Sequence, residues 1–284
     1  MNAMQHAIPA SSPAPAVRSR RIKTTPANTL TVYAAFLLRS GARTAAIWTA
    51  CAAAYLVALT FSFHQIAPAL TTTEYPSGLT RAFHIDEMQS INGFLSAEVF
   101  SFIPLVLAVY PIVLMANALA GAEERGQLDM LLGTPLSRTD LAIAKAASSL
   151  IPTAAMLLAI ASFGWLGGVI SGEHISVSTI YGATLALGPF MAFFGGVTLV
   201  FSALTHRFAT AMGLGVGVLL AMYALDMIAR ITERNAFGWF SAFHYYGSPM
   251  LDGVDWAGAV GMSVAAIILA ALAVILFQRR DIYS

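Results

Sequence analysis

The chain has 284 residues, of which 58% are hydrophobic and only 10% are charged, against roughly 25% charged residues in soluble domains. With a mean hydropathy of +0.73, its apolar surface cannot be hidden in one aqueous core. The formal net charge of +1 argues against a nucleic-acid partner, and the single cysteine, Cys51, excludes an intramolecular disulfide and a Cys-based metal site.

The N-terminal region precedes the first long apolar stretch. Residues 1–28 are rich in Ala, Ser and Pro and end in a basic run, which predicts a disordered cytoplasmic tail. In residues 29–43, apolar side chains recur at helical spacing while Arg39 and Arg43 lie on another face. This segment is too short to cross a bilayer, so we expect an amphipathic helix in the inner membrane interface.

Hydropathy then predicts an all-α polytopic membrane protein, in which residues 44–284 form a six-span transmembrane domain. Each predicted span reaches the roughly 20 residues that a helix needs to cross the bilayer core. The predicted spans are Thr44–Ile66, Ala97–Gly121, Ala146–Ile170, Thr179–Thr205, Thr210–Ile231 and Ala257–Phe277.

The distribution of basic residues predicts the orientation. Lys and Arg concentrate in the cytoplasmic loops of membrane proteins. With both termini in the cytoplasm, only Arg81, Arg230 and Arg234 of the 15 Lys and Arg residues fall outside. We therefore expect a multi-pass protein of the cell (inner, cytoplasmic) membrane with cytoplasmic N- and C-termini.

The segment 232–256, on the outer side, is dense in aromatic residues among Gly and Pro. It fits an aromatic belt in the headgroup zone, and a re-entrant segment that serves as a gate or substrate port is the alternative. Asp226 is an ionisable residue within a span, and Arg230 follows at i+4, so the two form either an ion pair near the interface or a gate. The candidate substrate-pathway residues are Asp226, Arg230, Phe243, Tyr245 and Tyr246.

The connection between the second and third spans is the most charged inner loop. Leu128, Leu131 and Leu132 make one apolar face of a short helix, which Pro135 ends. Ser137 then caps a new helix. The loop would thus consist of a short helix, a turn at Pro135 and a second helix capped by Ser137. Such a rigid element could transmit force from a soluble partner.

This loop resembles the signature loop of permeases of the type-2 exporter class of ABC transporters. The resemblance is carried by Glu124-Arg-Gly-Gln-Leu-Asp-Met-Leu-Leu-Gly-Thr-Pro-Leu-Ser-Arg138, by Lys145 and by Phe243-His-Tyr-Tyr-Gly-Ser-Pro249. It extends over most of the chain, although the Pro-rich tail and the long loop 67–96 depart from the family pattern. In this family the loop holds a coupling helix that docks on a separate nucleotide-binding subunit.

The resemblance implies a permease subunit of an ATP-driven exporter, working as a dimer with a second copy or a related permease. Two copies of an ATP-binding subunit, rather than this chain, would hold ATP and Mg²⁺ and carry out hydrolysis, so the chain itself would be neither an enzyme nor a cofactor protein. The implied coupling residues are Glu123, Glu124, Arg125, Gly126, Leu128, Leu131, Leu132, Pro135, Leu136, Ser137 and Arg138. An ordinary inner loop with topology-setting charges is the alternative.

Several motifs are missing from the chain. It has no Gly-x-x-x-x-Gly-Lys-Ser/Thr loop, no His-Glu-x-x-His pair and no Gly-x-Ser-x-Gly elbow. A membrane enzyme is therefore poorly supported. The alternative function is a secondary transporter that works without an ATPase, which predicts broken spans, paired ionisable residues near the midplane and an internal repeat.

Overall fold

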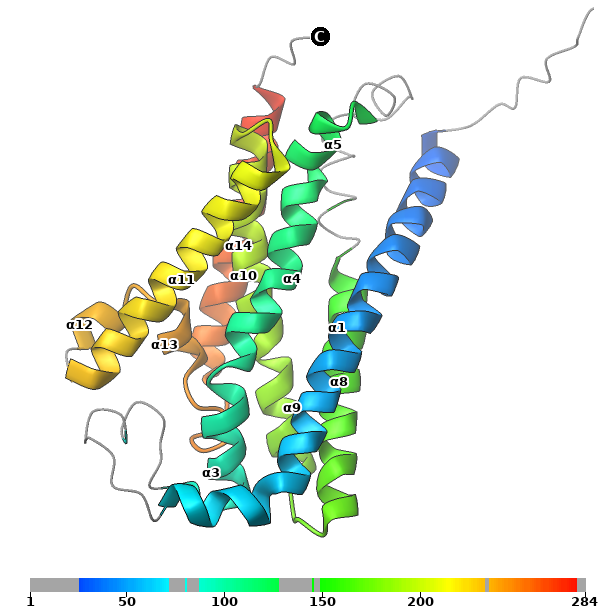
Figure 1. Cartoon of the computed structure of the whole chain (residues 1–284). Helices are drawn as coiled ribbons and strands as arrows, with labels where there is room; N and C mark the ends of the chain where they lie inside the picture. Colours follow the sequence, from blue (N-terminus) through cyan, green and yellow to red (C-terminus); the bar gives the residue numbers. More distant parts are fainter. Residues whose placement is uncertain are drawn as a thin grey trace, which may run out of the picture.

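A computed structural model describes residues 26–71, 80, 87–127, 145, 149–232 and 235–279, and within these ranges the regular structure is entirely helical. Five helices of the described part are long and apolar enough to cross a membrane. They run along a common direction as an elongated bundle (Figure 1). The helical class predicted from hydropathy is therefore confirmed.

The first helix, α1 (Pro26–Thr71), is one continuous element of 46 residues. The predicted interfacial helix 29–43 and the first predicted span both lie on it, and its membrane-spanning candidate is Gly41–Ala69. No proline interrupts it before Pro68, so nothing in the backbone chemistry separates the two segments. Placement of residues 29–43 in the interface stays a prediction. Residues 1–25 of the predicted tail 1–28 lie outside the described residues, and its last three residues belong to α1.

The predicted second span is divided into shorter helices in the structure. It consists of α3 (Ile91–Leu95), the π-helix η2 (Ser96–Phe100) and α4 (Ile103–Ala118), with a bend of 40° between the two halves. Pro104 stands in the first turn of α4, where a missing backbone N–H costs nothing. The six-span count holds if this bent pair is one span, because the structure otherwise provides five candidates among the described residues.

The remaining candidate spans overlap the predicted ones, with ends that differ by a few residues. The fourth predicted span is divided at Ala186 into two helices, which together make a 28-residue crossing candidate. The helices are α8 (Leu150–Ser171), α9 (Val177–Leu185), α10 (Leu187–Leu204), α11 (Phe208–Thr232) and α14 (Trp256–Gln278).

Helix α10 lies at the centre of the bundle, packed against α14, α4 and α11. Its Phe190 and Phe194 are fully buried. Small residues let its neighbours approach: a Cβ on Gly196 would lie 3.1 Å from Leu269 Cβ and 3.2 Å from the Ala266 carbonyl oxygen of α14. Close backbone approach of this kind is the usual basis of helix association in membranes, where the hydrophobic effect does not drive helices together.

We expect Gly196→Val to destabilise the bundle, because the new side chain meets backbone of α14 that cannot move independently. Overpacking of this kind costs about 1–3 kcal/mol. Thermal unfolding of the purified protein in detergent measures the loss. Gly261→Val is the matched control, since a Cβ on Gly261 of α14 meets no atom within 4 Å. Equal unfolding temperatures for the two variants would contradict the proposed packing.

Short helices lie toward the two ends of the bundle. Helix α5 (Ala120–Glu124) follows α4 at the end near the last described residues of α14, and we call this the α5 end (Figure 1). Helices α12 (Asn235–Gly238) and α13 (Ala242–Tyr246) lie on the side of the bundle away from α5, beside the distant part of α11 (Figure 1).

Candidate functional site

A cluster of polar side chains at the α5 end joins three parts of the chain: the α4–α5 connection, the α10–α11 connection and Lys145. We call this cluster the α5 junction. It comprises Asn117, Glu123, Glu124, Arg125, Lys145, Ser202 and His206.

Ser202 of α10 stabilises the break between α4 and α5. Its hydroxyl is fully buried and accepts hydrogen bonds from the backbone N–H groups of Leu119, at 3.3 Å, and Ala120, at 2.9 Å. It also donates to the carbonyl oxygen of Ala116 at 3.1 Å. Leu119, with φ −117° and ψ −65°, interrupts the helical ladder, so these groups need partners from outside the helix. One hydroxyl thereby attaches the end of α4 to α10.

The two acidic residues of α5 contact the α10–α11 connection. Glu124 Oε2 accepts a hydrogen bond from the backbone N–H of Phe208 at 2.8 Å, and Phe208 is the first residue of α11. Glu123 Oε1 lies 2.7 Å from His206 Nδ1. A carboxylate is favourable at a helix N-terminus, where unpaired N–H groups carry partial positive charge. Helix α5 is thus attached to the start of the fifth span.

Arg125 folds back onto α4. Its Nη1 donates to Asn117 Oδ1 at 3.0 Å, and Asn117 Nδ2 donates in turn to the Val113 carbonyl oxygen at 3.1 Å. A Cβ on Gly121 would lie 2.8 Å from Asn117 Oδ1, so glycine leaves room for this contact. Gly126 follows with φ +64°, a left-handed conformation that glycine adopts at little cost. The chain turns there into the segment 128–144.

Lys145 lies where the chain returns from that segment. Its Nζ donates a hydrogen bond to the carbonyl oxygen of Ala118, the last residue of α4. Burial, together with the nearby positive charge of Arg125, lowers the pKa of Lys145 to about 8. Both flanks of the segment 128–144 are therefore bonded to the end of α4.

Replacing Ser202 with Ala should destabilise the protein by about 1–3 kcal/mol, because two buried backbone N–H groups lose their acceptor. Thermal unfolding in detergent measures the effect. Ser263→Ala on α14 is the control, since the Ser263 hydroxyl bonds only within its own helix, to the Ala259 carbonyl oxygen. A Ser202→Ala variant as stable as Ser263→Ala would exclude the stabilising role.

The lowered pKa of Lys145 makes a prediction for pH dependence. In the unfolded chain the pKa of a lysine is near 10.4, which is roughly two units above the pKa of about 8 in the folded protein. Between these values the folded state binds fewer protons, so stability rises with pH. We expect the unfolding temperature of the wild type to increase relative to Lys145→Met from about pH 7 to about pH 10. The neutral amine still donates to the Ala118 carbonyl oxygen. A constant difference across this range would contradict the burial of the charge.

The structure tests only part of the predicted coupling set. Glu123, Glu124, Arg125 and Gly126 lie together at the α5 junction. Seven members lie outside the described residues, so the predicted coupling helix stays a prediction; they are Leu128, Leu131, Leu132, Pro135, Leu136, Ser137 and Arg138. Ser202 and His206 were not identified from sequence. His206 could have been identified, because it lies in the very short connection between the fourth and fifth predicted spans. That connection is on the predicted cytoplasmic side, as is Glu123.

A second polar group lies in the part of α11 distant from the α5 end. Asp226 is 4% exposed, and Arg230 Nε donates to its Oδ2 at 2.7 Å, which confirms the predicted i,i+4 ion pair. The two residues border a small cavity with Ser96 and Phe243. The volume of about 20 Å³ holds roughly one water molecule, so no drug-sized compound fits there in this conformation.

Helix α13 lines that cavity with Phe243 and Tyr246. The Phe243 ring packs edge-on against Phe190 at 4.8 Å and against Tyr223 at 5.3 Å, measured between ring centroids. The Tyr246 hydroxyl donates to the Ala183 carbonyl oxygen at 3.2 Å. Ser241 Oγ bonds to the Met222 carbonyl oxygen at 2.8 Å and caps the helix. The short helix is therefore held inside the bundle by α9, α10 and α11.

The predicted aromatic segment thus separates into two groups. Phe243 and Tyr246 are buried, whereas Trp239, Phe240 and Trp256 are 66%, 75% and 72% exposed. Tyr245 does not line the cavity; its hydroxyl donates to the Trp239 carbonyl oxygen at 3.1 Å. The buried members fit the packed alternative and the exposed ones fit an aromatic belt.

The long apolar helices define a multi-pass helical membrane protein, and the bent helix pair and the buried polar groups are features common in transporters. The family model for the C-terminal domain of the multidrug efflux system permease Rv1217c matches residues 15–278, so the chain belongs to this family of efflux permeases. No curated protein matches the chain.

Proposed function

We propose that the chain is the transmembrane subunit of an ATP-driven ABC exporter. It forms the substrate pathway as a dimer, with a second copy or a related permease, in the cytoplasmic membrane. Residues 122–145 dock two ATP-binding subunits, which hold ATP and Mg²⁺ and hydrolyse the nucleotide. The chain itself is a transport subunit and not an enzyme. Both termini lie in the cytoplasm, and six spans result when the bent pair counts as one.

The observation that carries this proposal is the hydrogen bond between Glu124 and the first residue of α11. Helix α11 has 25 residues and is therefore about 37 Å long. One of its ends is attached to α5, and Asp226 lies toward the other, beside α13. A displacement of α5 is therefore transmitted along one rigid helix to the opposite half of the membrane.

The anchoring of the segment 128–144 supports the same role. The chain leaves through Arg125 and Gly126 and returns at Lys145, and both Arg125 and Lys145 bond to the last two turns of α4. A force applied to the segment therefore reaches the second span as well as the fifth. This is the arrangement that a coupling element requires, because a loosely attached loop would absorb the motion.

We assign Asp226, Arg230, Phe243 and Tyr246 to a gate in the substrate pathway rather than to a binding pocket. The cavity that they border has room for about one water molecule. An amphipathic substrate can pass only if α13 moves away from α11 and α10. The Asp226–Arg230 pair holds the closed state, since its separation would leave the buried carboxylate of Asp226 without its positive partner.

The surface of α11 suits contact with a second permease. A Cβ added to Gly213 or Gly217 of α11 would meet no atom within 4 Å, so this surface is open. Leu214 and Leu220 on the same helix are 44% and 50% exposed. Glycines four residues apart allow close approach of another helix in a membrane. This face is the one that we propose for the dimer.

Co-expression of the tagged chain with a P-loop ATPase encoded beside it tests the docking. We expect the two proteins to co-elute in detergent and to hydrolyse ATP together. Glu124→Lys and Leu131→Asp should abolish co-elution while leaving insertion intact. The matched control is Glu173→Lys, because Glu173 pairs with His64 at the end distant from α5. Normal co-elution of both docking variants would overturn the assignment of residues 122–145.

A dye-efflux assay separates the proposal from the alternative of a secondary transporter. In cells that express the chain and its ATPase, efflux of ethidium should stop on ATP depletion and continue when an uncoupler removes the proton gradient at constant ATP. The reverse result would favour a secondary transporter. The Asp226–Arg230 pair and the broken second span are the observations that keep this alternative in view.

A further inference from the structure

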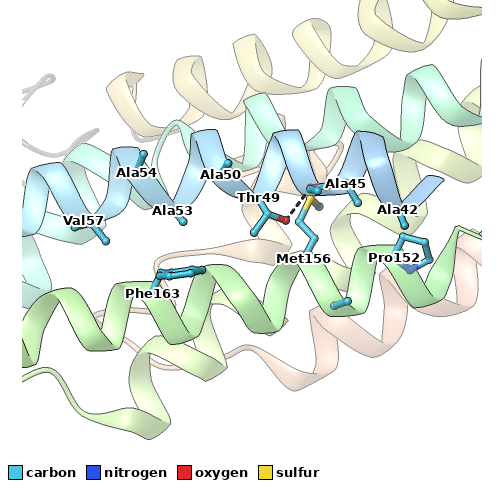
Figure 2. A pocket seen from close by; sticks show the side chains of 12 residues that line it. Ala42, Ala45, Thr49, Ala50, Ala53, Ala54, Val57, Pro152, Met156 and Phe163 are labelled. Atoms are coloured by element: carbon cyan, nitrogen blue, oxygen red, sulfur yellow. Dashed lines mark hydrogen bonds between the residues drawn. The ribbon is translucent and has the colours of Figure 1, made fainter. Parts of the chain in front are cut away.

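An apolar groove of about 610 Å³ lies between α1 and α8. Figure 2 shows the side chains of Pro152, Met156 and Phe163 of α8 facing α1 across it. The α1 side is lined mainly by Ala42, Ala45, Ala46, Ala50, Ala53 and Ala54. Small side chains on one helix leave a hollow that the larger residues of the other helix do not fill.

The two helices approach each other at both ends of the groove. A Cβ on Gly41 would lie 3.6 Å from Pro152 Cγ, and a Cβ on Gly164 would lie 2.4 Å from Leu56 Cδ2. Gly41 and Leu56 are about 22 Å apart along the axis of α1, which gives the length of the groove. The groove is thus a closed-ended slot along α1 and does not result from divergence of the helices.

The chemistry of the slot fits a hydrocarbon occupant. Both of its walls belong to candidate membrane spans. Thr49 contributes a hydroxyl group to the lining. That hydroxyl already donates to the Ala45 carbonyl oxygen at 2.8 Å, as Figure 2 shows. The two helices that form its walls also pack directly against each other, so the slot is narrow. A single acyl chain is slender enough to enter it.

A positive charge stands at one end of the slot. Arg43 is exposed and has no hydrogen bond or ion pair with any residue that the structure describes. Ala46, which lines the slot, lies at i+3 from Arg43, so the two side chains are neighbours on the helix surface. Arg43 is two residues from Gly41, where the candidate span begins. A guanidinium at this depth is placed to pair with the phosphate of a lipid headgroup.

We propose that this slot binds one anionic glycerophospholipid. One acyl chain lies between α1 and α8, and the phosphate pairs with Arg43 at the α5 side of the membrane. In the apolar 18-residue window of the α1 span only 22% is buried within the described chain, which leaves surface for a lipid to contact. This lipid site is independent of the proposed ATP-driven transport, and it is a structural ligand site rather than a transport pathway.

Native mass spectrometry of the delipidated protein, titrated with phosphatidylglycerol or phosphatidylcholine in detergent, tests the proposal. We expect the wild type to bind one phosphatidylglycerol about tenfold more tightly than phosphatidylcholine. Ala46→Trp fills the slot and should weaken binding of both lipids by about tenfold or more. Arg43→Gln should bind the two lipids alike. Ile267→Trp, at a 69% exposed position of α14, is the matched control and should bind as the wild type does.

Three results would overturn the proposal. Equal binding of the two lipids by the wild type would show that Arg43 does not select an anionic headgroup. Unchanged phosphatidylglycerol binding by Ala46→Trp would remove the slot as its site. A change of oligomeric state in Ala46→Trp without a change in lipid binding would assign the groove to a second copy of the chain. Arg43 is exposed, so Arg43→Gln tests headgroup selectivity even if Ala46→Trp folds poorly.

Discussion

The hydroxyl of Ser202 is the contact on which the α5 end depends. A helix that breaks inside an apolar environment leaves backbone groups that water cannot reach, and each must find a partner in the protein. Ser202 accepts from two such N–H groups and donates to a third residue's carbonyl oxygen. Lys145 satisfies the neighbouring Ala118 carbonyl oxygen. Because the break is stabilised in this way, α5 can turn away from α4 and place Glu124 at the start of α11.

The two polar regions of the molecule are connected by α11. At one end its N-terminus is capped by a carboxylate from α5, and toward the other it carries the ion pair beside α13. The central helix α10 contacts both regions, through Ser202 and through Phe190. The tight glycine-mediated packing of α10 on α14 provides a fixed frame. Motion of α5 and α11 against this frame is the simplest mechanical basis for the transport cycle that we propose.

The membrane spans could be predicted from sequence because long apolar runs depend on composition alone. The Asp226–Arg230 pair could be predicted because its spacing is local. Two features could not. Residues 29–43 suggested a separate helix, yet no local signal distinguishes a break near Gly41 from a continuous α1. The contacts of Ser202 and His206 join residues more than 80 positions apart, and such contacts depend on how helices pack. The predicted coupling residues beyond Gln127 lie outside the described structure, so their role stays a prediction.

The π-helix η2 changes how the second span is oriented. Its wider turn adds a residue relative to an α-helix, so side chains on its two sides differ in phase by about 100°. The hydroxyls of Ser101 and of Tyr55 on α1 reach carbonyl oxygens there, those of Ser96 and Glu98. A helical wheel drawn through Ala97–Gly121 as one regular helix therefore assigns residues before Ser101 to the wrong face. Deletion of one residue from η2 would rotate α3 relative to α4.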